Sequence, residues 1–368
     1  MSPFRIDIPS ADLSGLRRRL LATRWPDELP GAGWDLGVSR EYLRALVGYW
    51  ADGYDWRRQE QRLNALPQAT TVIDGQLLHF LHVRSPHPEA QALLLLHGWP
   101  GTVADFLPLI GELSDTFHLV VPSLPGFGFS GPTTTAGWDP PRMARAFAAL
   151  MHRLGYHRYG VQGGDFGSVI AADLGRADPR QVTGVHLNAL PTASMPVDQH
   201  QAETLTAAER DQVEANKAWW RAHNGYATQM ATRPQTLAYA LTDSPAGQLA
   251  WYLEWFVGHD PDATTQSPVE ADAILTDTTI LWLTNTAGSA ARLYHEAAAG
   301  TFGRPQRISG VPTAVANFRE DRAVRGLAVQ SHRLVRWTEI DAGGHFAALQ
   351  APRELAADVR EFFASLRC

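Results

Sequence analysis

The stretch Gly163-Gly164-Asp165-Phe166-Gly167 lies where an expected strand at 159–162 passes into an expected helix at 166–177. Small residues two positions before and two after a central residue permit a strand-to-helix turn so tight that larger side chains would clash. Such a turn would expose the central side chain, here Asp165, as a nucleophile. The same five residues are also typical of an Asp that caps the following helix, because Asp is a preferred N-cap.

Short apolar segments and helices alternate on both sides of this turn. Strands are expected at 93–96, 119–121, 159–162, 182–187, 311–315 and 334–340, and helices at 103–113, 139–154, 166–177 and 352–366. Alternation of buried strands with helices predicts an α/β fold, with a mostly parallel sheet covered by helices on both faces.

Two segments depart from this alternation. Residues 192–304 show a pattern of helices with long polar loops, so we expect a helical insert in the sheet. Residues 1–90 are rich in Arg, Trp and Pro, and helices are expected there at 10–23 and 39–51, separated by a Pro/Gly segment. We therefore expect an N-terminal arm (1–90), a first part of the core (91–191), a helical lid (192–304) and a second part of the core (305–368).

Composition narrows the class of protein. The chain has 368 residues, of which 45% are hydrophobic and 19% charged, as expected for a globular core. A net charge of -6 offers no electrostatic basis for binding nucleic acid or an anionic membrane. The N-terminus lacks a basic segment followed by an apolar run, and no stretch is long enough to span a membrane, so we expect a cytoplasmic protein. The single cysteine, Cys368, excludes an intrachain disulfide.

Two later positions favour the nucleophile over the helix cap. A nucleophile of this kind expects an acid after a later strand and a His after the last strand, in that chain order. Asp321 and Glu320 follow the strand at 311–315, and His345 follows the strand at 334–340. Any of the 14 His could be structural, but the order and placement together support Asp165 as a nucleophile.

The segment His97-Gly98-Trp99-Pro100 follows the first buried strand. In this arrangement the loop would supply the backbone N–H of Trp99 to an oxyanion hole, and the N–H of Phe166 would be the second donor. We expect His97 to hold the loop and the Trp99 side chain to form a wall of the pocket.

These motifs, in this order, resemble the epoxide hydrolases of the α/β-hydrolase fold, most closely the microsomal type. The resemblance covers nearly the whole chain: the arm from Pro3 to about Thr70, HGWPG at 97–101, GGDFG at 163–167 and GGHFAALQAP at 343–352. The segment 241–247 of the insert resembles the lid of that family. We expect no N-terminal anchor of the kind that the membrane-bound relatives have, so the chain resembles a soluble bacterial version.

The resemblance implies further site residues. Two lid tyrosines of the family match Tyr226 and Tyr294, which would contact the epoxide oxygen, and Trp99 and Phe166 would also contact the substrate. The family's acid matches Asp321. Glu320 stays the alternative, because the family usually has Pro two residues before the acid and this chain has Arg319 there.

The reaction that the resemblance implies needs no metal or organic cofactor. Asp165 would attack an epoxide carbon and form an ester, while Tyr226 and Tyr294 assist the leaving oxygen. Asp321 would orient His345, which would activate water to hydrolyse the ester and release a vicinal diol. The expected partner is a small-molecule epoxide. If the protein assembles, a homodimer is the default expectation.

Three other classes of protein share part of this pattern. A dehalogenase would use the same Asp165 but needs a donor for the halide, and Phe166 has none. A non-catalytic ligand-binding protein on this fold predicts loss of Asp165, His345 or the acid, and all are present. A serine esterase would need Ser at position 165, whereas Ser168 lies in the helix beyond. The identity of the epoxide, the stereochemistry and the choice between detoxification and biosynthesis stay open.

Overall fold

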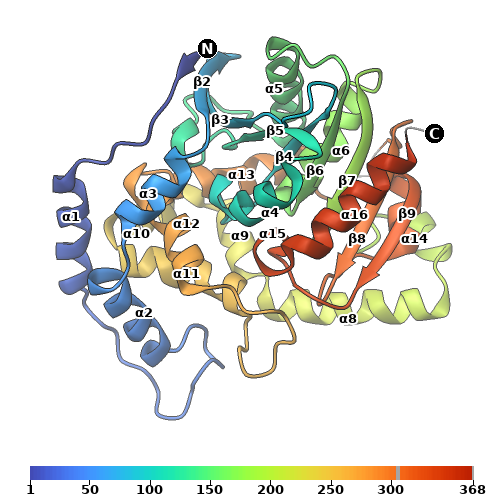
Figure 1. Cartoon of the computed structure of the whole chain (residues 1–368). Helices are drawn as coiled ribbons and strands as arrows, with labels where there is room; N and C mark the ends of the chain where they lie inside the picture. Colours follow the sequence, from blue (N-terminus) through green and yellow to red (C-terminus); the bar gives the residue numbers. More distant parts are fainter. Residues whose placement is uncertain (304–306, 367–368) are drawn as a thin grey trace.

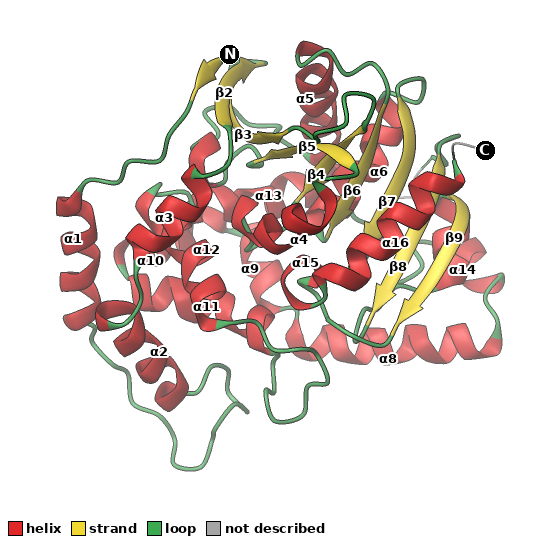
Figure 2. Cartoon of the chain, in the orientation of Figure 1, coloured by secondary structure: helices red, strands yellow, loops and turns green. Residues whose placement is uncertain are grey.

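A nine-stranded sheet forms the centre of the computed structural model, which describes residues 1–303 and 307–366 (Figures 1 and 2). The strands are β1 (Ser2–Pro3), β2 (Gln68–Ile73), β3 (Gln76–Val83), β4 (Gln91–Leu96), β5 (Phe117–Pro122), β6 (Tyr159–Gly164), β7 (Val182–Asn188), β8 (Pro312–Phe318) and β9 (Arg333–Ile340). Their order is β1-β2-β3-β5-β4-β6-β7-β8-β9. The six strands from β4 to β9 are parallel, and β1, β2 and β3 join antiparallel. The expected mostly parallel sheet is confirmed.

Helices cover both faces of the sheet. On one face lie α5 (Pro140–Arg153) and α6 (Phe166–Ala177), and on the other lie α4 (Leu107–Leu113) and α16 (Pro352–Ser365), which crosses in front of the sheet in Figure 1. In β4, Leu94 and Leu96 join the apolar cluster that includes α5 and α6, whereas Leu93 and Leu95 join the cluster that includes α4 and α16. Successive side chains of a strand point to opposite faces, so an unbroken run of leucines suits a strand buried on both sides.

The first ninety residues contain three strands that the sequence analysis did not expect. Strands β2 and β3 form a hairpin that turns at Asp74-Gly75, where both residues have positive φ. Asp-Gly between two apolar runs is a typical hairpin turn, so this pair could have been found from the sequence. The sheet therefore extends well into the segment that we expected to be an arm.

The rest of that segment packs against the lid. Its helices are α1 (Ser10–Leu21), α2 (Arg40–Asp52) and α3 (Trp56–Asn64), and they lie beside α11 (Pro245–Val257) and α12 (Ala271–Leu283) in Figure 1. The indole N–H of Trp50 donates to Thr279 Oγ1 at 2.9 Å, and the Tyr49 hydroxyl donates to Asp272 Oδ1 at 2.7 Å. These hydrogen bonds attach α12 of the lid to α2 of the N-terminal segment.

The described residues between β7 and β8 form helices joined by loops and contain no strand, as expected. Besides α11 and α12 it contains η3 (Pro191–Ala193), α7 (Gln199–Glu203), α8 (Ala207–His223), α9 (Gly225–Thr232), α10 (Pro234–Asp243) and α13 (Ala287–Gly300). Figure 2 shows the arrowheads of β8 and β9 pointing toward α8, so this segment lies across the carboxyl ends of the strands. Residues 304 and 305, where we placed the boundary between the lid and the second part of the core, lie outside the described residues, as does Cys368.

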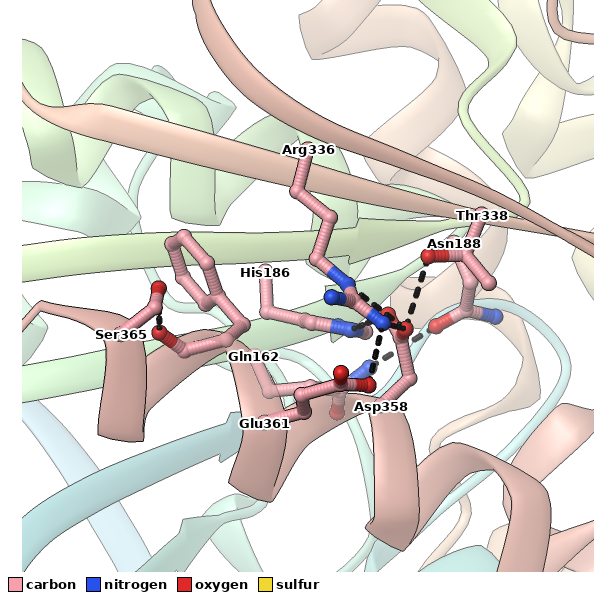
Figure 3. A network of polar contacts seen from close by, with 9 residues as sticks. Gln162, His186, Asn188, Arg336, Thr338, Asp358, Glu361 and Ser365 are labelled. Carbon is pink, nitrogen blue, oxygen red and sulfur yellow. Dashed lines mark hydrogen bonds and ion pairs between the residues drawn. The ribbon is translucent and has the colours of Figure 1, made fainter.

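A buried polar network holds α16 on the sheet (Figure 3). Asp358 of α16 accepts hydrogen bonds from Arg336 and Thr338 of β9, and its Oδ2 lies 2.9 Å from Nε2 of His186 in β7. Burial alone would raise the pKa of Asp358, but these partners together hold it well below its ordinary value. The network thereby fixes the middle of α16 on the sheet, and this helix follows the loop that carries His345.

None of the helices in the described part of the chain is both long and apolar enough to span a lipid bilayer.

Candidate active site

The turn between β6 and α6 is as tight as its glycines predict. A Cβ atom on Gly163 would lie 2.2 Å from the carbonyl oxygen of Gly167, and a Cβ atom on Gly167 would lie 2.0 Å from the carbonyl oxygen of Leu96. Asp165 itself has a φ of 54°, a strained value for a residue with a side chain. Backbone atoms therefore exclude side chains at both flanking positions, which confirms the predicted turn.

Asp165 does not cap α6. Its side chain accepts no hydrogen bond from the first turn of that helix, and Oδ1 instead accepts the backbone N–H of Trp99 at 2.9 Å. The helix-cap interpretation of the five-residue motif is therefore wrong. The backbone N–H of Trp99, which we expected in the oxyanion hole, already donates a hydrogen bond to the carboxylate of Asp165. For the N–H of Phe166, the structure records no acceptor within the described residues.

His97 holds the loop that carries this N–H. Its Nδ1 lies 2.9 Å from the carbonyl oxygen of Gly98, and its Nε2 accepts the backbone N–H of Leu124 at 3.1 Å. Burial lowers the pKa of His97 to about 4, so the ring is neutral at neutral pH. This arrangement agrees with the structural role expected for His97.

His345 faces Asp165. Its Nε2 lies 3.6 Å from Asp165 Oδ2, slightly beyond hydrogen-bond distance. Burial lowers the pKa of His345, and the nearby Asp165 carboxylate opposes that effect only in part. The imidazole therefore stays neutral at neutral pH, as a general base requires.

The two candidate acids have different surroundings. Asp321 Oδ2 accepts the backbone N–H groups of Ala189 and Phe318, each at 3.1 Å, and burial raises the pKa of Asp321 to about 7. Glu320 is exposed, and its carboxylate accepts hydrogen bonds from the 264–266 loop of the lid. Asp321 is thus fixed at the carboxyl ends of β7 and β8. No hydrogen bond joins it to the His345 ring among the residues that the structure describes.

The two lid tyrosines lie together beside the turn at residues 163–167, which we call the elbow. Tyr226 of α9 stacks on Trp99 (centroids 5.5 Å apart, planes at 17°), and Tyr294 of α13 contacts Trp99 and Phe166 edge-on at 5.4 and 4.8 Å. The two phenols are also hydrogen-bonded to each other. Burial and the Asp165 carboxylate raise both pKa values, so both phenols keep their protons.

Most of these groups line one large cavity. It has a volume of about 930 Å³, and six of the candidate residues line it: Asp165, Phe166, Tyr226, Tyr294, Asp321 and His345. Trp99, which we expected to contact the substrate, lines only a smaller cavity of about 40 Å³ on the other side of Asp165. Among the described residues, no three His, Cys, Asp or Glu side chains are grouped as a metal site would need.

Sequence reasoning missed several residues near the site. Gln266 approaches the backbone N–H of His345 at 3.4 Å, and its own side chain contacts Glu320. The smaller cavity is lined by Asp105 and Gln162, which no motif indicated. The ring of Trp255 in α11 lies 4.8 Å from the His345 ring. Nothing in the spacing of these residues along the chain points to the site.

The chain is similar to known proteins over nearly its whole length. A family model described as "Epoxide hydrolase N terminus" matches residues 1–106, and one described as "alpha/beta hydrolase fold" matches residues 91–352. A protein of Stigmatella aurantiaca named "Putative epoxide hydrolase" is 40% identical over 100% of this chain and 86% of its own length. "Epoxide hydrolase 1" of Sus scrofa is 30% identical over 99% of this chain and 88% of its own. The structure of Aspergillus niger epoxide hydrolase matches at a TM-score of 0.88 with 31% identity, covering 99% of this chain and 96% of that one.

Proposed function

Because the chain belongs to the epoxide hydrolase family of the α/β-hydrolase fold, we propose that it adds water to an epoxide and releases a vicinal diol through an ester on Asp165. One observation carries the mechanism. The carboxylate of Asp165 stands free of its own helix at the wall of the large cavity, which the protonated phenols of Tyr226 and Tyr294 also line.

In the first step Asp165 attacks a ring carbon of the epoxide from behind the breaking C–O bond. A carboxylate needs no base for this attack, which explains Asp rather than Ser at the elbow. The oxygen that leaves the carbon develops negative charge, and Tyr226 and Tyr294 are the donors within the cavity that can protonate it. The product is an ester between Asp165 and the opened substrate.

In the second step water attacks the carbonyl carbon of that ester. His345, neutral because of its burial, accepts a proton from the water, and the N–H of Trp99 stabilises the oxyanion. The ionised form of Asp321 would orient and stabilise the imidazolium, which requires the His345 ring to turn from Asp165 toward Asp321. Collapse of the tetrahedral intermediate, with return of the proton from His345 to the leaving oxygen, then releases the diol. The proton left on the Asp165 carboxyl group returns to the tyrosine that protonated the epoxide oxygen, which restores the carboxylate.

The cavity favours a bulky, largely apolar epoxide. Its volume of about 930 Å³ is near the upper end of the roughly 300–1,000 Å³ of small-molecule sites. Aromatic side chains of Trp219, Trp220, Trp255 and Phe302 also line it. Charged groups lie at Glu254 and Arg322, so the substrate can carry a polar group at one end.

The test is a single turnover of excess enzyme with styrene oxide in ¹⁸O-water. We expect an unlabelled diol, and one ¹⁸O atom in the carboxylate of Asp165, detected by mass spectrometry of the peptide that contains it. The reason is that the new diol oxygen comes from Asp165, which is then replenished from water. Label in the diol of the first turnover would exclude the ester.

A pair of variants separates the two steps. His345→Gln removes the base but leaves the nucleophile, so the ester should form and persist as a mass increase on the peptide containing Asp165. Asp165→Asn is the matched control and should form no adduct. Loss of ester formation in His345→Gln would contradict the role proposed for His345.

A further inference from the structure

A second cavity lies behind the nucleophile. Its volume is about 40 Å³, and its lining includes Asp105, Gln162 and Trp99. The two cavities share only Asp165 and His345 among the residues that line them. Asp165 and His345 therefore lie between the large cavity and the small one, and each of them lines both cavities.

Two buried acceptors of this small cavity have no partner. Asp105 Oδ1 and Gln162 Oε1 make no hydrogen bond within the described part of the chain, although these residues are only 6% and 1% exposed. The amide nitrogen of Gln162 is occupied, because it donates to Asn188 Oδ1 at 2.8 Å (Figure 3). A buried acceptor without a donor is unfavourable, because it has lost its hydrogen bonds to water. A molecule with two donors, such as water, matches this pair of oxygens.

Asp105 is held in place by a second buried carboxyl group. It is hydrogen-bonded to Asp277 of α12, and Asp277 Oδ1 in turn accepts the hydroxyl of Thr102 at 2.5 Å. Burial raises the pKa of both groups, that of Asp277 to about 6. The pKa of Asp105 lies well above its ordinary value, because the charge of Asp277 and the hydrogen bond to it add to the effect of burial. Asp105 is thus the neutral acid of the pair, and its Oδ1 is a carbonyl acceptor.

The carboxyl group of Asp105 occupies the space that a side chain at position 101 would need, and the residue there is glycine. A Cβ atom on Gly101 would fall 1.9 Å from Asp105 Oδ2. The loop after β4 therefore leaves room for this one carboxyl beside the elbow. Its neutral form adds no charge next to the Asp165 carboxylate.

We propose that the small cavity holds the water that hydrolyses the ester, and that Asp105 and Gln162 position this water against Asp165 and His345. The inference rests on the proposed function and specifies the source of its water. A site needs roughly 10–15 Å³ of this kind of volume for each water, so about 40 Å³ suits two or three molecules. While the opened substrate fills the large cavity, the ester can still be reached from this side.

The step balances as follows. The oxygen of the water bonds to Cγ of Asp165, and one of its protons passes to His345 Nε2. Its other O–H donates to Asp105 Oδ1 or, through a second water, to Gln162 Oε1. The bond between Cγ and the substrate oxygen then breaks, and the proton returns from His345 to that oxygen, which releases the diol. The second proton of the water stays on the new carboxyl group of Asp165 and passes to the phenolate that the first step left, which restores both groups.

The test compares Asp105→Leu and Asp105→Asn in single turnovers with styrene oxide. Asp105→Leu removes the acceptor, so the ester should form at the parent rate and its hydrolysis should slow by up to about 100-fold. Asp105→Asn mimics the neutral acid, with an N–H toward Asp277 and a carbonyl toward the cavity, and should restore most of that loss. Parent-rate hydrolysis in Asp105→Leu would overturn the proposal. So would hydrolysis in Asp105→Asn that is as slow as in Asp105→Leu, because Asp105 would then act as an ionised base.

Two further variants control for folding and burial. If Asp105→Leu alone fails to fold, the double variant Asp105→Leu/Asp277→Leu removes the charge left unpaired and should show the same slow hydrolysis. Asp173 is also a buried carboxyl with an unpaired oxygen, but it lines neither cavity, so Asp173→Leu should hydrolyse the ester at the parent rate. Slowed hydrolysis in Asp173→Leu would assign the effect to burial in general. If the parent protein forms no ester, the proposed function fails instead, and that result is distinct.

Discussion

The elbow can be tested at Gly167 by a single added methyl group. In Gly167→Ala the new Cβ atom would lie 2.0 Å from the carbonyl oxygen of Leu96 and 2.8 Å from that of His97. Cβ atoms essentially never approach other atoms closer than 3.0 Å, so the first contact must lengthen by 3.0 − 2.0 = 1.0 Å. Both obstacles are backbone atoms, which cannot rotate away, so α6 must move from β4.

This displacement has two consequences of definite size. Overpacking against backbone should cost about 3 kcal/mol of stability, the upper end of the range for small-to-large substitutions. In a chain of this length that lowers Tm by about 4 °C. Because Asp165 begins the helix that moves, its distances to the Trp99 N–H (2.9 Å) and His345 (3.6 Å) change too. A misplacement of about 1 Å should slow ester formation on the order of 100-fold.

The assay measures thermal unfolding and the single-turnover rate of ester formation in the same preparation. Gly111→Ala is the matched control, because Gly111 lies in α4 with no atom within 4 Å of its added Cβ, and alanine there should be neutral or slightly stabilising. If Gly167→Ala melts and reacts like the parent protein, the reasoning about the elbow is refuted.

Three further outcomes are expected. Tyr226→Phe and Tyr294→Phe should each slow ester formation by about 10²–10³-fold, as loss of one preorganised donor does, and unchanged rates would remove the phenols from the mechanism. Burial lowers the pKa of His345 but raises that of Asp321 to about 7, and hydrolysis needs the ionised form of Asp321, so ester hydrolysis should slow as the pH falls through about 7; a pH–rate profile with no fall near pH 7 would contradict the role of Asp321. Asp358→Asn should cost about 3–5 kcal/mol in urea unfolding at pH 7, by breaking a buried pair. Since its pKa is lowered in the folded state, this stabilisation is complete above the unfolded-state pKa near 4 and is lost as the pH falls through the folded value, so the deficit should shrink in acid.

The parallel part of the sheet and the elbow could be predicted because their causes are local. The leucines of β4 indicate a strand buried on both faces, and the glycines around Asp165 are required by atoms a few residues away or by the adjacent strand. The strands of the first ninety residues were missed although Asp74-Gly75 indicates a hairpin, because that turn was not weighed against the helical pattern before it. The expectation that Trp99 contacts the substrate did not account for Tyr226, which stacks on its ring.

The sequence alone determined the class of the protein, the order of its candidate site residues along the chain and Asp165 as the candidate nucleophile. These predictions rest on motifs of a few residues, which constrain the local backbone regardless of how the rest of the chain folds. Only the tertiary structure distinguished Asp321 from its neighbour Glu320, through backbone N–H groups of two strands, one of them more than a hundred residues away. It alone brought Asp105, Gln162 and Asp277 to the back of the nucleophile. Contacts between side chains so far apart depend on strand order and helix packing, which no local pattern encodes.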